Sequence, residues 1–188
     1  MKRILIVGLV LAMAVTAFAG GNPNVKAYLS FDPGGALVHT YTQTQYVSFN
    51  VYVCLTDLDM GMTTVSFMLS DPMVDCPGLF AAESFTNLLP GNLAIGAWNT
   101  GITLASTDCM TGPTVVVGYL NLFPVAVGPC CIYLLPHPDY PGWVVDCTEP
   151  NGLVDIYGLI ADGQASISEG CASPVEDVTW GSIKALYQ

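Results

Sequence analysis

The sequence predicts an all-β protein, an antiparallel β-sandwich. Three observations support this fold class: apolar and polar residues alternate along many short segments, turn residues separate these segments, and the domain body lacks helical periodicity. The 19 glycines and 13 prolines suit a chain rich in turns. About ten short strands at roughly 10-residue spacing fit a sandwich or a barrel.

The clearest strand signal lies between Tyr46 and Ser70. Its first half alternates strictly, with apolar residues at Val47, Phe49, Val51, Val53 and Leu55 and with Cys54 on the other face. After the loop Thr56–Met62, a second run places Val65, Phe67 and Leu69 on one face. Two such runs joined by a short loop with aspartate and glycine predict a β-hairpin.

The other strands are expected on both sides of this segment. Turn residues bound each of them, among them Asp32–Gly35, Pro90–Gly91, Asn151–Gly152 and Asp162–Gly163. The expected strands are Val25–Phe31, Leu79–Phe85, Leu93–Trp98, Ile102–Ser106, Thr114–Phe123, Cys131–Leu135, Trp143–Cys147, Leu153–Ile160 and Ala165–Ile167.

The N-terminus has the pattern of a secretory signal peptide, residues 1–19. Lys2 and Arg3 precede the apolar run Ile4–Val15, and Ala17–Ala19 forms a small-residue cleavage site. The run is too short to span a bilayer comfortably, although an uncleaved anchor is the alternative. We therefore expect a secreted bacterial protein, extracellular or at the cell surface, without stable membrane insertion. Its β-sandwich domain would span residues 20–167.

The mature protein is strongly acidic. Without Lys2 and Arg3, two lysines stand against 15 acidic residues, which gives a net charge of −13 with histidine neutral. Such a surface repels phosphate backbones, so nucleic acids and anionic membranes are not expected partners. Solubility outside the cell accounts for the charge without any ligand, and extracellular proteins or glycans remain as partners.

Seven cysteines in an exported chain predict up to three disulfides and one free thiol. The adjacent pair Cys130 and Cys131 is expected to bond to separate partners, and a Cys131–Cys147 bridge would close a hairpin around Pro136–Pro141. The pairing stays open among 15 connectivities of six cysteines. The odd thiol either joins two chains or is buried and inert. The candidates are Cys54, Cys76, Cys109, Cys130, Cys131, Cys147 and Cys171.

The C-terminal residues 168–188 form a small-residue linker and a tail with a short possible helix. From Asp177 onward, Trp180, Ile183 and Tyr187 fall on one helical face. A helix this short needs something to pack against. It is either an end that frays or docks on its own sandwich, or a peptide that docks on a partner or sorts the protein.

The order of these features resembles the cohesin-like modules of secreted bacterial proteins, which have a carbohydrate-binding type of fold. The resemblance rests on strand order from Val25 to Ile167, including Val47–Val53, Met62–Phe67, Thr114–Leu122 and Ile156–Ile167. It implies a jelly-roll sandwich, cohesin- or immunoglobulin-like, that binds dockerin modules through one sheet face. The seven cysteines and the single-domain layout depart from the cohesin pattern.

The residues expected of an enzyme are sparse. His39 and His137 are the two histidines, and His137 between two prolines is a loop residue rather than a general base. No nucleophile elbow, zinc-protease motif or phosphate loop is present. Asp71, Asp75 and Glu83 would serve a glycosidase only if they converged. We therefore expect no enzyme and no catalytic residues.

Two candidate sites remain, one for calcium and one for glycans. Asp57 and Asp59 lie in a turn where carboxylates can bind calcium, although EF-hand spacing is absent and such turns are usually only solvated; no other cofactor is expected. Aromatic side chains stack on sugar rings when they line one exposed face, but Trp98 and Trp143 can instead be core residues. The glycan candidates are Trp98, Tyr133, Tyr140 and Trp143.

The sequence thus favours a secreted, non-catalytic binding or structural module that presents a sheet face to a protein partner at the cell surface. One alternative is a carbohydrate-binding module. Another is an oligomeric role, as the subunit of an extracellular filament or surface layer.

Overall fold

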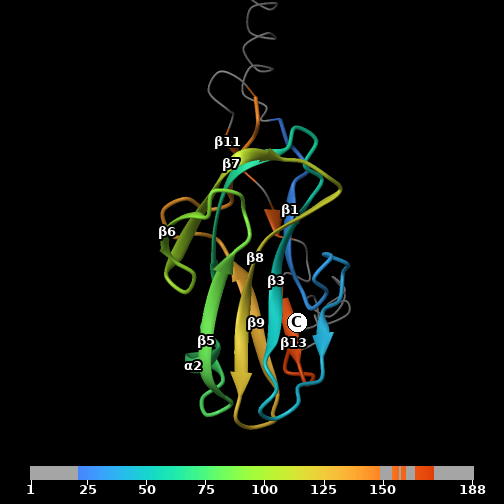
Figure 1. Ribbon diagram of the computed structural model, residues 1–188, viewed down its shortest axis with the longest axis vertical. Helices are drawn as coiled ribbons and strands as arrows, with labels where there is room; N and C mark the ends of the chain where they lie inside the picture. The colour runs from blue at the N-terminus through green and yellow to red at the C-terminus, as the bar shows by residue number, and fades with distance from the viewer. Residues whose placement is uncertain (1–20, 149–153, 157, 160–163, 172–188) are drawn as a thin grey trace, which may run out of the picture.

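The computed structural model describes residues 21–148, 154–156, 158–159 and 164–171 (Figure 1). The expected signal peptide lies outside these residues, as do the candidate docking residues Trp180, Ile183 and Tyr187 of the tail. The described chain forms two packed β-sheets and one short helix, which confirms the predicted all-β sandwich. No helix in these ranges is both long enough and apolar enough to cross a membrane.

The first sheet contains five strands: β1 (Lys26–Ser30), β3 (Phe49–Thr56), β5 (Phe80–Asn87), β8 (Thr114–Pro124) and β12 (Gly158–Leu159). Their order across the sheet is β12-β1-β3-β8-β5. All neighbours are antiparallel except β1 and β12, which are parallel. The long strands β3 and β8 form the centre of the sheet, and β5 lies at one edge (Figure 1).

The second sheet contains the other eight described strands: β2 (Thr40–Tyr41), β4 (Met62–Leu69), β6 (Leu93–Ala97), β7 (Gly101–Met110), β9 (Cys130–Leu135), β10 (Trp143–Val145), β11 (Val154–Ile156) and β13 (Gln164–Ile167). Its main path is β11-β10-β4-β9-β13-β2, and β7 pairs with both β4 and β6. The expected strand Leu153–Ile160 is therefore divided, because β11 belongs to this sheet and β12 to the first one.

The predicted hairpin between Tyr46 and Ser70 is wrong. β3 pairs with β1 and β8 in the first sheet, whereas β4 pairs with β7, β9 and β10 in the second. Residues 57–61 therefore cross between the sheets. Alternation shows that each strand has one buried face, but two strands that face each other across a core alternate in the same way as two paired strands. Val47 lies before β3 and is exposed.

The core fills the space between the two sheets. Val51, Val53 and Leu55 of β3 are fully buried, as are Val65 and Phe67 of β4. Their burial from water is the main force that holds the sheets together. The apolar residues predicted to point inward from these two strands are thus in the core, apart from Val47.

Cys54, which the alternation places on the polar face of β3, is nevertheless fully buried. The loop after β1 covers it: the Tyr28 hydroxyl donates a hydrogen bond to the Gly35 carbonyl, and a Cβ atom on Gly35 would lie 3.6 Å from the Cys54 Sγ. Burial raises the pKa of the Cys54 thiol to about 12. Cys54 is the free cysteine of the chain, buried and unreactive.

One helical turn, α2 (Pro72–Asp75), corrects the expectation that the domain body has no helix. The Asp71 carboxylate accepts hydrogen bonds from the backbone N–H groups of Met73 and Val74, at 3.0 and 3.3 Å. Pro72 occupies the first turn, where its missing N–H costs nothing. A capping aspartate followed by proline is a helix-start signal, but one turn is too short to show periodicity.

Three disulfides join Cys76 to Cys130, Cys109 to Cys147, and Cys131 to Cys171. Cys130 and Cys131 bond to separate partners because successive residues of β9 point to opposite faces. The Cys131–Cys147 bridge considered from the sequence does not form. Strand β4 lies between β7 and β10. Cys109 belongs to β7 and Cys147 follows β10, so their bridge passes across the end of β4.

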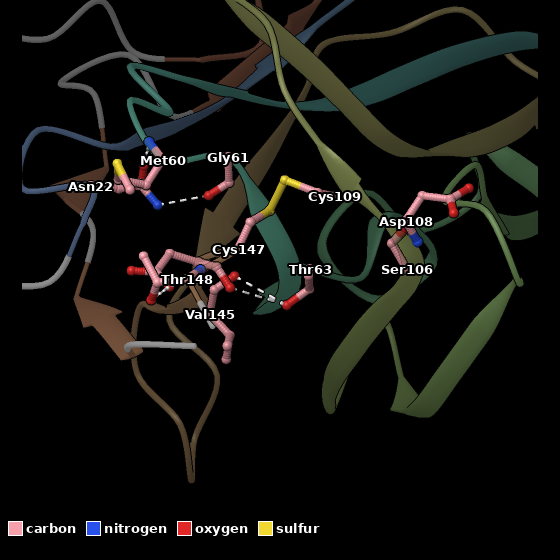
Figure 2. The surroundings of a disulfide bond; sticks show 11 residues. Asn22, Met60, Gly61, Thr63, Ser106, Asp108, Cys109, Val145, Cys147 and Thr148 are labelled. Atoms are coloured by element: carbon pink, nitrogen blue, oxygen red, sulfur yellow. Dashed lines mark hydrogen bonds between the residues drawn. A yellow bond between two sulfur atoms is a disulfide. The ribbon is translucent and has the colours of Figure 1, made fainter. Parts of the chain in front are cut away.

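The crossing loop 57–61 is fixed beside the Cys109–Cys147 bridge (Figure 2). The buried Asn22 side chain donates to the Gly61 carbonyl at 2.8 Å and accepts from the Met60 N–H at 2.8 Å. Gly61 has φ 66°, and a Cβ atom there would lie 2.7 Å from the Cys109 Sγ. Glycine is therefore required at this point, because both the backbone conformation and the disulfide exclude a side chain.

Candidate binding surface

The outer face of the second sheet carries a groove over β4, β7, β6 and β10. Val65 and Val144 point into the core and pair side by side, so their strand neighbours point outward. The Ser66 and Thr103 hydroxyls form a hydrogen bond of 2.9 Å on this face. The groove has a volume of about 380 Å³ and is lined by Thr64, Ser66, Ile95, Thr103, Tyr140, Trp143 and Val145. We call these seven residues the outer groove.

Aromatic and aliphatic side chains form the exposed part of the outer groove. Tyr140 and Trp143 are 43% and 37% exposed, and their ring centroids are 4.8 Å apart. Ile95 from β6 is 78% exposed. Solvent-accessible apolar side chains grouped around a hollow are the usual feature of a binding site.

His137 holds the loop that carries Tyr140. Its Nδ1 atom accepts hydrogen bonds from the backbone N–H groups of Asp139 and Tyr140, both at 3.1 Å, and its ring contacts the Tyr140 ring at a centroid distance of 5.0 Å. A Cβ atom on Gly101 would lie 2.8 Å from His137 Nε2, so a glycine at this position leaves room for the imidazole. The buried His137 is therefore a structural residue of this loop.

The structure brings two of the four glycan candidates together. Tyr140 and Trp143 lie side by side in the outer groove. Trp98 is partly buried and packs against the core, which is the core position considered as its alternative. Tyr133 is 43% exposed on β9 and does not line the groove. Sequence reasoning missed Ile95, because the alternation of Leu93–Ala97 does not show which face of that strand is open.

The calcium candidates Asp57 and Asp59 lie in the crossing loop. Asp57 has φ 59° and its carboxylate lies 3.6 Å from the Lys26 Nζ, with both side chains about half exposed. Within the described ranges, no three histidine, cysteine, aspartate or glutamate side chains come together as a metal site would require. A calcium ion at this loop would therefore need backbone carbonyl oxygens for most of its ligands.

Asp71 and Glu83, far apart in sequence, come together where α2 meets β5. Burial, the charge of Asp71 and a hydrogen bond with Asp71 together raise the pKa of Glu83 to about 7, against the lowering effect of a backbone hydrogen bond from Met73. Hydrogen-bonded carboxyl groups are closer than the ~5 Å that separates a retaining pair in glycosidases. Asp71 also accepts from the Asn99 side chain at 2.9 Å and caps α2, so the pair is structural.

The protonation of Glu83 predicts a pH-dependent stability. The folded chain keeps this proton up to about pH 7, whereas the unfolded chain loses it near the ordinary value of 4.5. The folded state therefore binds more protons between these values, and its stability falls as the pH rises through them. We expect the free energy of unfolding to drop by roughly 1–2 kcal/mol between pH 5 and pH 8, less than the full shift implies because Glu83 is only partly buried.

Urea unfolding at several pH values checks this expectation. Glu83→Gln should remove most of the drop, because a neutral amide does not titrate. Asp75→Asn is the matched control, since it removes a carboxylate from an exposed position of α2. If both variants keep the same pH dependence as the original protein, the Glu83 proton does not contribute to stability.

Comparison with known proteins gives a result at the level of structure. The sequence matches no protein-family model and no curated protein sequence. A type I cohesin from Clostridium thermocellum, solved in complex with a dockerin, matches over 77% of this chain and 97% of the cohesin, with 10% identity and a TM-score of 0.50. The chain has the cohesin fold.

Other cohesins give similar matches. The seventh ScaB type I cohesin of Pseudobacteroides cellulosolvens matches over 83% of this chain and 98% of its own, with 10% identity and a TM-score of 0.48. A non-cellulosomal cohesin from the archaeon Archaeoglobus fulgidus matches over 77% and 89%, with 11% identity and a TM-score of 0.42. The fold expected from strand order is confirmed by the match to the Clostridium thermocellum cohesin.

Proposed function

We propose that this protein is a non-catalytic module that binds another protein through the outer groove. The single observation that carries the proposal is the exposed cluster of Tyr140, Trp143 and Ile95 around a hollow of about 380 Å³. Tyrosine and tryptophan in such hollows provide much of the binding energy at protein interfaces. The sheet beneath them is rigid, because three antiparallel neighbours pair with β4.

The architecture agrees with this proposal. A cohesin of the same fold was solved in complex with a dockerin, so this fold can serve protein recognition. The described part of our chain offers no catalytic constellation: His137 is used by its own loop, and Asp71 caps a helix. The identity of the partner does not follow from the fold.

The test replaces Trp143 by alanine. We expect a loss of about 2 kcal/mol, or roughly 30-fold in Kd, because an anchoring aromatic side chain is removed from the centre of the interface. The partner is first identified by chemical cross-linking of the mature protein to the surface fraction of the producing bacterium. Its affinity for each variant is then measured by calorimetry.

Tyr133→Ala is the matched control for this experiment. It also removes an aromatic side chain about 40% exposed on the same sheet, but outside the outer groove. Its affinity for the partner should stay within a factor of about two of the original. Equal losses from both substitutions, or none from either, would place the binding site elsewhere.

Carbohydrate binding is the second candidate, and the Tyr140–Trp143 pair is the observation that favours it. Two adjacent exposed rings can stack on successive sugar rings. Affinity electrophoresis in gels that contain soluble polysaccharides distinguishes the two functions. Retardation that Trp143→Ala abolishes would favour a glycan, whereas unchanged mobility together with a cross-linked protein partner favours protein recognition.

We also infer that the protein acts outside the cell, at the surface or secreted. The signal-peptide pattern, the three disulfides and the acidic composition support this location. A role as a filament or surface-layer subunit remains the alternative. Sizing of the mature protein under non-reducing conditions, with and without residues 168–188, would reveal such assembly.

A further inference from the structure

Two strand edges, one from each sheet, are unpaired along one side of the sandwich. Among the described strands, β5 pairs only with β8, and β6 pairs only with β7. The two strands follow each other in sequence but belong to different sheets, and β6 stands away from the body of the domain (Figure 1). An unpaired edge presents a row of backbone N–H and C=O groups that another strand can bind.

A cleft of about 620 Å³ lies between these two edges. Phe85, Trp98 and Ile102 provide its apolar lining, and the small residues Ala94 and Gly96 of β6 leave it open. Asn87 and Asn92 add polar groups. This cleft faces the interior side of β6, whereas the outer groove lies on the opposite side of the same strand. We call it the edge cleft.

Polar contacts connect the two edges near the edge cleft. The Asn87 side chain of β5 donates to the Leu93 carbonyl of β6 at 3.1 Å. Asn99, which follows the lining residue Trp98 in the turn after β6, donates to Asp71 at 2.9 Å, and Asp71 contacts Glu83 of β5. The Leu93 carbonyl therefore points toward β5. By the two-residue period of a strand, the N–H and C=O of Ile95 point toward the same free edge.

The edge of β6 lacks the features with which proteins usually protect such edges. Its sequence, Leu-Ala-Ile-Gly-Ala, contains no charged residue and no proline, and all five residues are exposed. Leu93 is 53% and Ile95 78% exposed. Natural edge strands are normally blocked by lysine, proline, inward charges or a covering segment, because an open apolar edge pairs with other chains. An unprotected edge is consistent with use as a binding site.

Charge indicates which chain would pair there. The protein carries a net charge of −11, and Lys26, the only lysine or arginine in the described ranges, is already 3.6 Å from Asp57. Asp71 lies beside the edge cleft, because it contacts Asn99, the chain neighbour of the lining residue Trp98. A second copy of this chain would bring like charges together, whereas a segment with lysine or arginine would find opposite charge.

We propose that the β6 edge binds an extended, cationic segment of a partner protein by strand addition. The segment pairs with the free N–H and C=O groups of β6. Its alternate side chains enter the edge cleft over Phe85 and Trp98, and a lysine or arginine lies near Asp71. Such binding takes its affinity from backbone hydrogen bonds and its specificity from the pockets for alternate side chains. This site goes beyond the proposed function, because it uses the edge of the sheet rather than its outer face.

The test uses a display library of random linear peptides, selected on the mature protein and on the variant Ile95→Pro. Proline at residue 95 removes the edge N–H without removing a group that pairs with β7. We expect the peptides enriched on the original protein to alternate apolar residues and to contain lysine or arginine. Their affinity for Ile95→Pro should be lower by about tenfold or more.

Two further variants keep the outcome independent of a folding defect in Ile95→Pro. Ala94→Phe fills the edge cleft and leaves the backbone donors in place, so it should weaken the same peptides. Ile95→Thr keeps the edge N–H and should leave their affinity nearly unchanged. If Ile95→Thr alone abolishes binding, the peptides use the outer face of β6, and the proposal is wrong.

Tryptophan fluorescence locates the bound peptide. In a variant with Trp143→Phe and Trp180→Phe, Trp98 is the remaining tryptophan of the three, and its emission should shift when a selected peptide binds. Three results would overturn the proposal: peptides enriched equally on Ile95→Pro, peptides that are acidic or helical, and self-association of the protein through β6 without any peptide. None of these results bears on the outer groove. Failure of strand addition at β6 is therefore distinguishable from failure of protein binding at the outer groove.

Discussion

Replacing Cys109 and Cys147 together by serine is expected to lower the free energy of unfolding by about 4 kcal/mol. The bridge closes a loop of 38 residues, and the chain-entropy model assigns about this cost to the freedom that the unfolded chain regains. The bridge also contacts Gly61 at the crossing between the sheets, so its loss loosens the connection that positions β4 against β3.

Urea unfolding measures this loss in the free energy of unfolding. The Cys54→Ala background is used because it has no free thiol that could exchange with the disulfides. In thermal unfolding, the melting temperature should fall by roughly 8–16 °C, since one kcal/mol corresponds to about 2–4 °C for a domain of this size. Cys54→Ala alone is the control, because it keeps all three disulfides. A loss below about 1 kcal/mol in the double variant would mean that the unfolded chain gains little freedom from the open loop.

Phe67→Ala is expected to cost about 3–5 kcal/mol. Phe67 is fully buried at the centre of β4, and its ring lies edge-on to Phe85 of β5 at a centroid distance of 6.0 Å. This contact joins the two sheets beside the edge cleft. Alanine would leave a cavity between the sheets that rigid, paired strands cannot close.

Chemical unfolding of Phe67→Ala and Leu93→Ala provides the comparison. Leu93 is 53% exposed, so its replacement should change stability by no more than about 0.5 kcal/mol. A cost for Phe67→Ala as small as that for Leu93→Ala would show that the contact between β4 and β5 does not hold the sheets together.

The sequence predicted which residues are buried better than it predicted which strands pair. Alternation correctly placed Val51, Val53 and Leu55 in the core, because it depends only on the backbone of each strand. Pairing depends on where the chain turns, and the loop 57–61 crosses between sheets instead of closing a hairpin. The contacts that fix this crossing come from Asn22 and Cys109, which are distant in sequence and therefore invisible to a local pattern.

The candidate site was predictable only in part. The sequence predicts Tyr140 and Trp143 as glycan candidates because aromatic rings can stack on sugar rings, and in the structure a turn closed by the Trp143 N–H and the Tyr140 carbonyl brings them together. Trp98 has the same chemistry but lies against the core, since burial depends on the opposite sheet. The contact between Asp71 and Glu83 depends on how α2 packs beside the edge of β5. The sequence therefore identified the two carboxylates but did not predict that they come together.

The burial of Cys54 has a consequence for the oxidation of the chain during folding. Any disulfide that includes Cys54 leaves one of the six paired cysteines without its partner and keeps β3 from taking its place under the loop that contains Gly35. Such a chain stays open, and its wrong bond remains accessible to thiol exchange. Once the sandwich closes, the thiol with its pKa of about 12 no longer attacks a disulfide. Closure of the core thus removes Cys54 from further disulfide exchange.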